Sequence, residues 1–221
     1  MTKVFCIIPA LNEEKTIAEV IHKVKPLVTE VVLVDDGSTD QTKAIAAGAG
    51  ATVLEHIINR GQGAALETGN QYALQQGADI IFHFDADGQF LAEDIPTVLA
   101  PLMSGLADVV LGSRFLEKKS QLPWFKEKII MPIARLVNLL LIGAVLTDPQ
   151  SGFRAATADA WRKIQIHQNG MAHCSEIIAK IYKNKLRVAE VPITVKYDEF
   201  GQKFSGGIRI VKDLLLAKLM D

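Results

Sequence analysis

The clearest indication of the fold is the stretch Ile80-Ile81-Phe82-His83-Phe84-Asp85-Ala86-Asp87-Gly88-Gln89, near the middle of the chain. Its first half is almost entirely apolar, which is typical of a strand that is buried on both faces of a sheet. Side chains alternate along an extended backbone, so Asp85 and Asp87 are expected to point to the same side just beyond this strand. The stretch therefore predicts a buried strand with an Asp-x-Asp pair at its carboxyl end.

Short apolar runs of the same kind occur at regular intervals, and helical patterns separate them. Strands are predicted at 4–8, 31–34, 52–54, 80–84 and 109–111, and helices at 13–25, 42–49, 63–76 and 94–103. This alternation predicts an α/β fold with a mostly parallel sheet flanked by helices. Ligands of such sheets bind beyond the carboxyl ends of the strands, so the loops there form the candidate site.

The second half of the chain is less regular. Helices are predicted at 127–146, near 173–184 and at 208–220, with a loop at 148–154 and a strand at 187–191. No repeat or long linker divides the sequence, so we expect one domain over residues 1–221. The apolar run at 129–146 contains Arg135, and an arginine near the centre of a membrane span costs roughly 2.5–3.5 kcal/mol. This run is therefore expected either to be a buried amphipathic helix or to lie on a membrane surface.

The composition excludes several classes of protein. The 221 residues are 49% hydrophobic and 22% charged, as in a globular protein rather than a disordered one. Lys and Arg total 24 against 25 Asp and Glu, so the chain lacks the basic excess of a nucleic-acid-binding protein, and no nucleic-acid partner is expected. Cys6 and Cys174 are too few for a disulfide framework, and the N-terminus lacks the pattern of a signal peptide. We therefore expect a cytoplasmic location.

Acidic residues gather where the predicted strands end. Asp35 and Asp36 follow the second strand, and two adjacent carboxylates are costly to bury there unless something binds them. Asp85 and Asp87 offer hard oxygen ligands that suit Mg²⁺ or Mn²⁺, and such an ion bridges the oxygens of a diphosphate. Asn12 is expected to cap the first helix. The sequence thus predicts a metal-assisted diphosphate site at this edge of the sheet.

Six motifs follow one another along the chain: PALNEE (9–14), VDDGSTD (34–40), NRGQGAAL (59–66), DADGQ (85–89), GSR (112–114) and DPQSGFRA (148–155). Together they resemble the family 2 glycosyltransferases, and most closely the branch of dolichol-phosphate mannosyltransferases and bacterial polyprenyl-phosphate glycosyltransferases. The resemblance covers residues 3–200. It implies a GT-A fold that binds a nucleotide sugar, with a nucleotide-sugar-binding half at 1–115 and an acceptor-side half with amphipathic helices at 116–221.

The resemblance also implies roles for individual residues. The nucleotide-binding residues that it implies are Pro9, Leu11, Glu13, Asp36, Asp85, Ala86 and Asp87. The metal ligands that it implies for Mg²⁺ or Mn²⁺ are Asp85, Asp87 and Gln89. The residues that it implies for catalysis are Asp87, Arg114 and Arg154. Arg114 would face the donor's phosphate, and Arg154 would pair with the phosphate of a lipid acceptor because a guanidinium matches phosphate geometry.

The reaction implied is an inverting, metal-dependent transfer of a hexose from a nucleotide diphosphate sugar, of the GDP-mannose or UDP-glucose type, to a polyprenyl phosphate. A phosphate nucleophile is already anionic at neutral pH, so this reaction needs no strong base. Two alternatives stay open. A hydroxyl acceptor, such as a cell-surface glycan, would require a carboxylate base, for which Asp148 or Glu176 is available. The other alternative, a sugar-nucleotide-binding domain without turnover, would require neither an acceptor nor a base.

Two departures from the family pattern concern the acceptor side. The expected cluster of Arg, Gly, Ser and Lys after Val191-Pro192-Ile193 is matched only loosely by residues 197–205. Many bacterial members continue into two transmembrane helices, whereas this sequence ends at Asp221. We therefore expect either a soluble-type member or one that depends on a partner for anchoring. A peripheral location on the cytoplasmic face of a membrane fits the second alternative, with a membrane-anchoring partner or a homo-oligomer.

Overall fold

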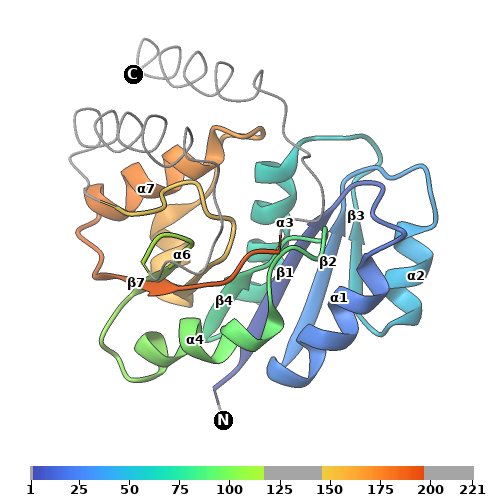
Figure 1. Cartoon of the computed structure of the whole chain (residues 1–221). Helices are drawn as coiled ribbons and strands as arrows, with labels where there is room; N and C mark the ends of the chain where they lie inside the picture. The colour runs from blue at the N-terminus through green and yellow to red at the C-terminus, as the bar shows by residue number, and fades with distance from the viewer. Residues whose placement is uncertain (1, 117–145, 197–221) are drawn as a thin grey trace, which may run out of the picture.

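A seven-stranded sheet with helices on both faces forms the centre of the molecule (Figure 1). The structure is a computed structural model, and it describes residues 2–116 and 146–196. The strands are β1 (Val4–Ala10), β2 (Glu30–Asp35), β3 (Thr52–Glu55), β4 (Ile80–His83), β5 (Val109–Ser113), β6 (Arg154–Thr157) and β7 (Val188–Pro192). They lie in the order β3-β2-β1-β4-β6-β5-β7.

Among the described strands, β6 alone runs antiparallel to its neighbours, while the other adjacent pairs are parallel. Arg154, the first residue of β6, lies opposite His83 of β4 and Leu111 of β5. Because β6 runs the other way, its beginning lies at the edge where β4 and β5 end. The segment that leads into β6 therefore arrives at the same edge as the Asp-x-Asp pair.

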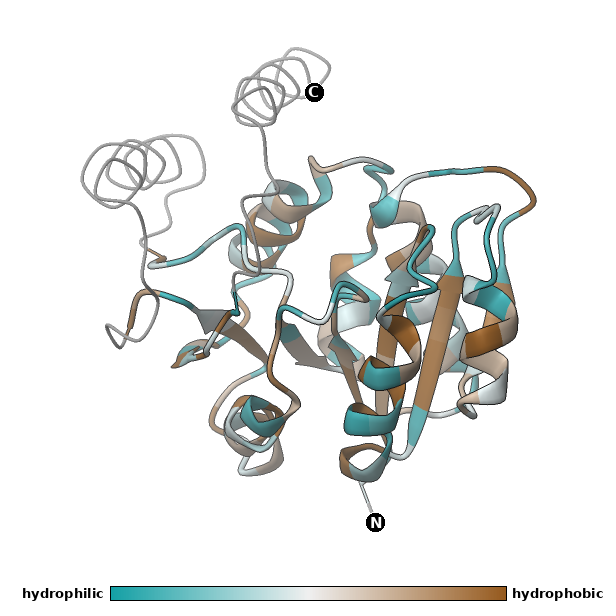
Figure 2. Cartoon of the chain, turned by 45° about the vertical axis from the view of Figure 1, so that its right-hand side comes forward, coloured by the Kyte–Doolittle hydropathy of each residue, from teal (hydrophilic) through white to brown (hydrophobic). Residues whose placement is uncertain are grey.

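Two hydrophobic clusters, one on each face of the sheet, form the core. The helices are α1 (Ile17–Val24), α2 (Thr42–Gly48), α3 (Gln62–Gln75), α4 (Ile95–Met103), α6 (Ala158–Ile164) and α7 (His173–Lys183). One cluster joins α1, α2 and α4 to alternate strand residues such as Cys6 and Ile8, and the other joins α3, α6 and α7 to the residues between them, such as Ile7. Figure 2 shows this as apolar colouring concentrated on the central strands. Burial on both faces explains the nearly continuous apolar runs of the sequence.

The predicted α/β architecture is confirmed, with shifts at several element ends. The first helix begins at Ile17 rather than at residue 13, because residues 13–16 form a turn in which Thr16 and Ile17 donate their backbone N–H groups to the carbonyl of Glu13. The prediction that residues 148–154 form a loop was wrong at its end, since Arg154 begins β6. Neither β6 nor α6 was predicted.

Two of the predicted helices fall in parts of the chain that the structure does not describe. The helices predicted at 127–146 and 208–220 lie outside the described residues, apart from Leu146, and so does the segment 197–205. Within residues 2–116 and 146–196, no helix combines the length and the apolar character that crossing a bilayer requires.

Candidate active site

Loops from the ends of β1, β2, β4 and β5 meet at the carboxyl edge of the sheet. Glu13, on the loop after β1, and Asp87, on the loop after β4, are close enough to interact electrostatically. Burial raises the pKa of Glu13, a hydrogen bond from Thr16 opposes this, and the charges of Asp87 and Asp40 raise it further. The structure thus brings together acidic residues from two of the predicted motifs, which are more than 70 positions apart in the sequence.

Asp85 is the more enclosed carboxylate of the Asp-x-Asp pair. Its Oδ1 accepts a hydrogen bond of 3.3 Å from Nε2 of Gln62, in the first turn of α3. Gly152 packs directly against it, and a Cβ at that glycine would lie 2.6 Å from Asp85 Oδ2. Burial, followed by the charge of Asp87, raises the pKa of Asp85 from 3.8 to about 6, although Arg154 opposes the shift.

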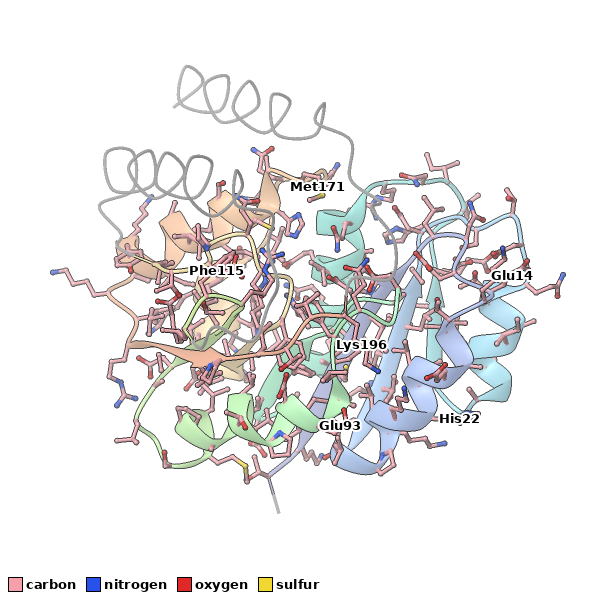
Figure 3. All side chains as sticks on the ribbon, viewed as in Figure 1. Glu14, His22, Glu93, Phe115, Met171 and Lys196 are labelled. Carbon is pink, nitrogen blue, oxygen red and sulfur yellow. The ribbon has the colours of Figure 1, made fainter. Side chains whose placement is uncertain are left out.

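Asp87 and Gln89 lie further out, on the turn that follows. Asp87 is exposed, and its Oδ1 accepts the backbone N–H of Gln89 at 2.9 Å. Burial raises the pKa of Asp87, and this hydrogen bond opposes the rise. The carbonyl of Gln89 accepts the backbone N–H of Lys196 at 2.9 Å, so the segment after β7 braces the turn. Figure 3 shows Lys196 in front of the central strands.

These carboxylates fit a divalent ion that is shared with a diphosphate. Two neighbouring acids whose pKa values are both raised are suited to a cation, because a cation favours their charged forms. In the part of the chain that the structure describes, no group of three or more His, Cys, Asp and Glu side chains could hold a metal by itself. An ion bound to Asp85 and Asp87 would therefore need further oxygens, of the kind that a diphosphate could supply. Whether Gln89 contributes stays a prediction.

Asp85 gives this site a testable pH dependence. Below a pH of about 6 its carboxyl is protonated and loses the charge that attracts a cation. We expect the Kd for Mn²⁺, measured with UDP present, to rise as the pH falls through 6, by about tenfold per unit for one proton.

Protonation of Asp85 has the opposite effect on the stability of the metal-free protein. The folded pKa exceeds the unfolded value, so the metal-free protein should become less stable as the pH rises from 4 to 6. Titrations with Mn²⁺ at pH 7.5 and 5.5 test the expected change in metal affinity, and equal affinity at both values would contradict it.

Asp36 is buried and already paired within the chain. Its Oδ1 contacts Nδ1 of His56 at 2.7 Å and accepts the N–H of Arg60 at 2.9 Å, while its Oδ2 accepts the N–H of Gly61 at 2.7 Å. Asp35 is satisfied in the same way by the backbone and hydroxyl of Ser38. The two carboxylates therefore need no ligand to explain their burial. The contact of Asp36 with a base or ribose stays a prediction.

The loop after β1 is tied to the loop after β2. Pro9 and Ala10 are buried at the end of β1, and Leu11 is 42% exposed. Asn12 has a φ of 57° and accepts the N–H of Thr39 through Oδ1 at 2.9 Å. The expectation that Asn12 caps the first helix was therefore wrong, because its side chain bonds the neighbouring loop instead. Pro9, Leu11 and Glu13 stay predicted contacts of a nucleoside.

Arg114 is held by a buried acid. Its Nε and Nη2 donate to the two oxygens of Asp148 at 2.6 and 2.8 Å, which is the bidentate geometry typical of a strong charged pair. The guanidinium also lies 5.5 Å from the centre of the Phe115 ring. Asp148 thus fixes the orientation of Arg114 at the end of β5, and the contact of Arg114 with a donor phosphate stays a prediction.

Arg154 lies beneath the site rather than on its surface. It is 2% exposed, and its Nη2 donates to Sγ of Cys174 at 3.2 Å. Its Nε has no hydrogen-bond partner among the described residues. Burial alone would raise the pKa of the Cys174 thiol, but Arg154 and His173 lower it to about 6. The guanidinium is buried beside Asp85 and Cys174, and the acceptor contact implied by the resemblance stays a prediction.

The chain matches a known protein family over most of its length and has relatives of known name. Residues 5–164 match the family described as glycosyl transferase family 2. The chain is 32% identical to a UDP-N-acetylglucosamine–dolichyl-phosphate N-acetylglucosaminyltransferase of Methanococcus voltae, over 98% of this chain and 96% of the relative. It is 31% identical to an undecaprenyl-phosphate mannosyltransferase of Micrococcus luteus, over 93% of this chain and 89% of the relative.

Solved structures agree on the fold. A glucosyl-3-phosphoglycerate synthase of Mycobacterium tuberculosis superposes with a TM-score of 0.77 at 24% identity, over 98% of this chain and 80% of that one. The same enzyme in complex with Mn²⁺, UDP and glucosyl-3-phosphoglycerate gives a TM-score of 0.76 at 20% identity, over 99% and 79% of the two chains. At such identities the likeness concerns the fold alone, and it confirms the predicted GT-A architecture.

The protein therefore is a glycosyltransferase. It belongs to glycosyl transferase family 2, as its six motifs predicted, and relatives named for dolichyl, undecaprenyl and polyprenol phosphates confirm the expected polyprenyl-phosphate branch.

Proposed function

We propose that this glycosyltransferase transfers a hexose from a nucleotide diphosphate sugar to a polyprenyl phosphate, with inversion at the sugar and with Mg²⁺ or Mn²⁺ as cofactor. The observation that carries the proposal is the pair Asp85 and Asp87, whose carboxylates have raised pKa values at the edge where β4 ends. In this proposal residues 1–115 bind the donor, and residues 116–221 form the acceptor side, on the cytoplasmic face of a membrane.

The names of the relatives support both substrates. The relatives from Methanococcus voltae and Micrococcus luteus are named for transfer to dolichyl and undecaprenyl phosphate, and the first is named for a UDP sugar. The structural neighbour has been crystallised with UDP and with Mn²⁺ or Mg²⁺. These findings favour a nucleotide diphosphate donor with a divalent ion and a lipid phosphate acceptor.

The mechanism that we propose assigns positioning to most of the residues. A bound ion would neutralise charge on the departing diphosphate, which is the main electrostatic demand of the step. Asp85 and Asp87 would hold this ion, and Gly152 and Gln62 contact Asp85 and so restrict its position. Arg114, oriented by Asp148, faces the donor phosphates.

Both carboxylates that could act as the base for a hydroxyl acceptor, Asp148 and Glu176, are already paired with other groups of the chain, and this disfavours such an acceptor. Asp148 is committed to Arg114. Glu176 accepts backbone N–H groups from His167 and Gln168, at 3.0 and 2.8 Å through Oε2, and pairs with Lys180 at 2.7 Å through Oε1. Each of the two candidate bases therefore has a structural task. A phosphate acceptor, which brings its own negative charge, needs no such base.

Replacing Glu176 distinguishes these two routes. We expect Glu176→Gln to keep kcat within about threefold at neutral pH, because a lost general base would instead cost about 10²–10⁴-fold. Stability should fall by about 1–2 kcal/mol, since the amide cannot accept all of the hydrogen bonds that the carboxylate accepts. Steady-state kinetics and thermal melting measure the two effects. A hundredfold loss of kcat in a folded variant would favour the hydroxyl acceptor.

The proposal as a whole is tested in two steps. Thermal shift with GDP-, UDP- and dTDP-sugars, with and without Mn²⁺, identifies the donor, because a ligand of the folded state raises the melting temperature. Transfer of the labelled sugar to undecaprenyl or dolichyl phosphate then tests the acceptor. A donor that binds only with Mn²⁺, followed by labelled lipid, is the expected result. Binding without turnover to any lipid or glycan would instead indicate a sugar-nucleotide-binding domain.

A further inference from the structure

The loop between β3 and α3 carries two neighbouring isoleucines that lie almost wholly in solvent. Ile57 is 97% exposed and Ile58 is 70% exposed, and no other large apolar side chain in residues 2–116 and 146–196 is as exposed as Ile57. Single exposed apolar residues are common on protein surfaces. Two adjacent β-branched residues at a loop tip are uncommon, because such tips typically consist of Gly, Asn, Asp, Ser and Pro.

Both ends of this loop are fastened to one buried carboxylate. Asp36 contacts the ring of His56, which precedes the isoleucines, and accepts the backbone N–H groups of Arg60 and Gly61, which follow them. The backbone N–H of His56 also donates to the carbonyl of Asp35 at 2.8 Å. The tip is therefore held outward on a fixed base, so its exposure is a feature of the fold.

The tip lies at the edge of the sheet where the candidate active site lies. Gly63, at the start of α3, donates its backbone N–H to the carbonyl of Asn169 at 2.8 Å, and this packs the loop before α7 against the loop before α3. A Cβ at Gly63 would lie 2.0 Å from the carbonyl oxygen of Gln168, so only glycine allows this approach. Met171, 46% exposed, lies on the second loop.

The pictures agree with this placement. Figure 2 shows the apolar tip between β3 and α3 at the upper edge of the molecule. Figure 3 shows Met171 at the same upper edge, far from His22 near the lower end of α1. Apolar side chains are thus presented on two packed loops at the end of the sheet that carries Asp85 and Asp87.

We propose that residues 57–60, with Met171 on the same edge, dock on the surface of a lipid bilayer. Ile57 and Ile58 would enter the interface, and the exposed Arg60 would face anionic headgroups, because apolar insertion and a neighbouring cation act together at such surfaces. This inference rests on the proposed function, since a polyprenyl phosphate is presented by a bilayer. It names the part of the chain that meets that bilayer.

The size of the patch favours a bilayer over a protein partner. A stable protein interface buries about 800 Å² on each partner, over about 20–30 residues. Two isoleucines and one methionine provide far less, whereas a bilayer accepts a small apolar protrusion without matching its shape. Docking here would also hold the open edge of the sheet toward the headgroups, where the acceptor's phosphate lies.

The first experiment places a fluorescent reporter on the tip. Cys6 and Cys174 are buried, so Ile57→Cys can be labelled selectively with an environment-sensitive maleimide on the full chain. With vesicles of phosphatidylcholine and phosphatidylglycerol, we expect the emission to move to shorter wavelength and to intensify. The matched control is Leu106→Cys, whose side chain is also well exposed but follows α4, at the opposite end of the sheet. Its emission should not change. No change at position 57 with any vesicle overturns the proposal.

The second experiment removes the apolar tip. The double variant with Ile57→Asp and Ile58→Asp should lower vesicle binding in flotation by about tenfold or more, while Met103→Asp with Leu106→Asp should leave it unchanged. Thermal melting checks that both variants fold, which their exposed positions favour. Equal vesicle binding by the tip variant and the wild type overturns the proposal. So does a change in oligomeric state without any vesicle signal, which would assign the tip to a second copy of the chain.

Acceptors of two lengths separate this inference from the proposed function. The tip variant should lose transfer to a long-chain polyprenyl phosphate in vesicles but keep transfer to a short, water-soluble one. If the wild-type protein transfers sugar to neither acceptor, the proposed function fails, and the fluorescence at position 57 still decides whether docking occurs. If the wild type transfers to both and the tip variant does the same, docking is overturned and the proposed function stands.

Discussion

Asp87→Ala is expected to abolish Mn²⁺-dependent binding of the nucleotide sugar and to lower transfer by about a thousandfold, while leaving the fold intact. The side chain is exposed beyond the end of β4, so its removal opens no cavity. Loss of a carboxylate that holds a cation removes several kcal/mol from the stabilisation of the leaving diphosphate. Thermal shift with the donor, with and without Mn²⁺, measures the binding.

The control for this variant is another exposed aspartate. Asp159 lies in the first turn of α6 and pairs only with the exposed Arg162 among the residues described, so Asp159→Ala should leave donor binding unchanged. The melting temperature of metal-free Asp87→Ala should stay within about 2 °C of the wild type, as is usual for a surface substitution. A variant that binds the donor with unchanged dependence on Mn²⁺ would exclude Asp87 as a metal ligand.

Arg154→Ala is expected to destabilise the protein by about 3 kcal/mol, a loss of roughly 6–12 °C in the melting temperature at this size. Arg154 is among the largest fully buried side chains that the structure describes, so its truncation leaves a cavity. It also removes the cation that favours ionisation of Asp85 and Cys174. Donor binding and acceptor use should therefore decline together.

Kinetics at a temperature where the variant is folded test the second part of this expectation. A rise confined to the KM of the acceptor, with normal donor hydrolysis, would restore the acceptor contact that the family resemblance implies for Arg154. Arg154→Lys provides a second measurement, because it keeps a buried positive charge. We expect it to retain more stability and more metal binding than Arg154→Ala, and equal losses in both variants would indicate that only the shape of the side chain matters.

Much of the fold could be predicted because its signals are local. Strands buried between two helical layers are apolar on both faces, so runs such as β1 and β4 are visible in the sequence. β6 has no such signal, since Arg154-Ala155-Ala156-Thr157 lacks the bulky apolar residues of a buried strand. Its conformation comes from the slot between β4 and β5, which pair with it on both sides. Contacts of that range cannot be derived from a short run of residues.

The candidate site, too, could be predicted only where its signals are local. Alternation next to a buried strand predicted Asp85 and Asp87 as neighbours, and the charge of Asp87 does raise the pKa of Asp85. The pairing of Asp36 was not predictable, because its partners His56, Arg60 and Gly61 lie 20–25 positions away. The ion pair of Arg114 with Asp148 spans 34 positions, and neither residue by itself identifies the other. Sequence patterns thus identified the acids at the strand ends, and the structure supplied the groups that hold them.

The antiparallel strand β6 has a consequence for how such enzymes diversify. β5 ends at Ser113 and β6 begins at Arg154, on one and the same edge of the sheet. Doubling the length of the connection between them costs only about 0.6 kcal/mol of closure entropy. The register of β6 depends on its own pairing with β4, where Ala155 and Ala156 lie opposite Phe82 and Ile81. An evolving lineage can therefore lengthen or shorten this connection while the acidic pair that follows β4 stays unchanged.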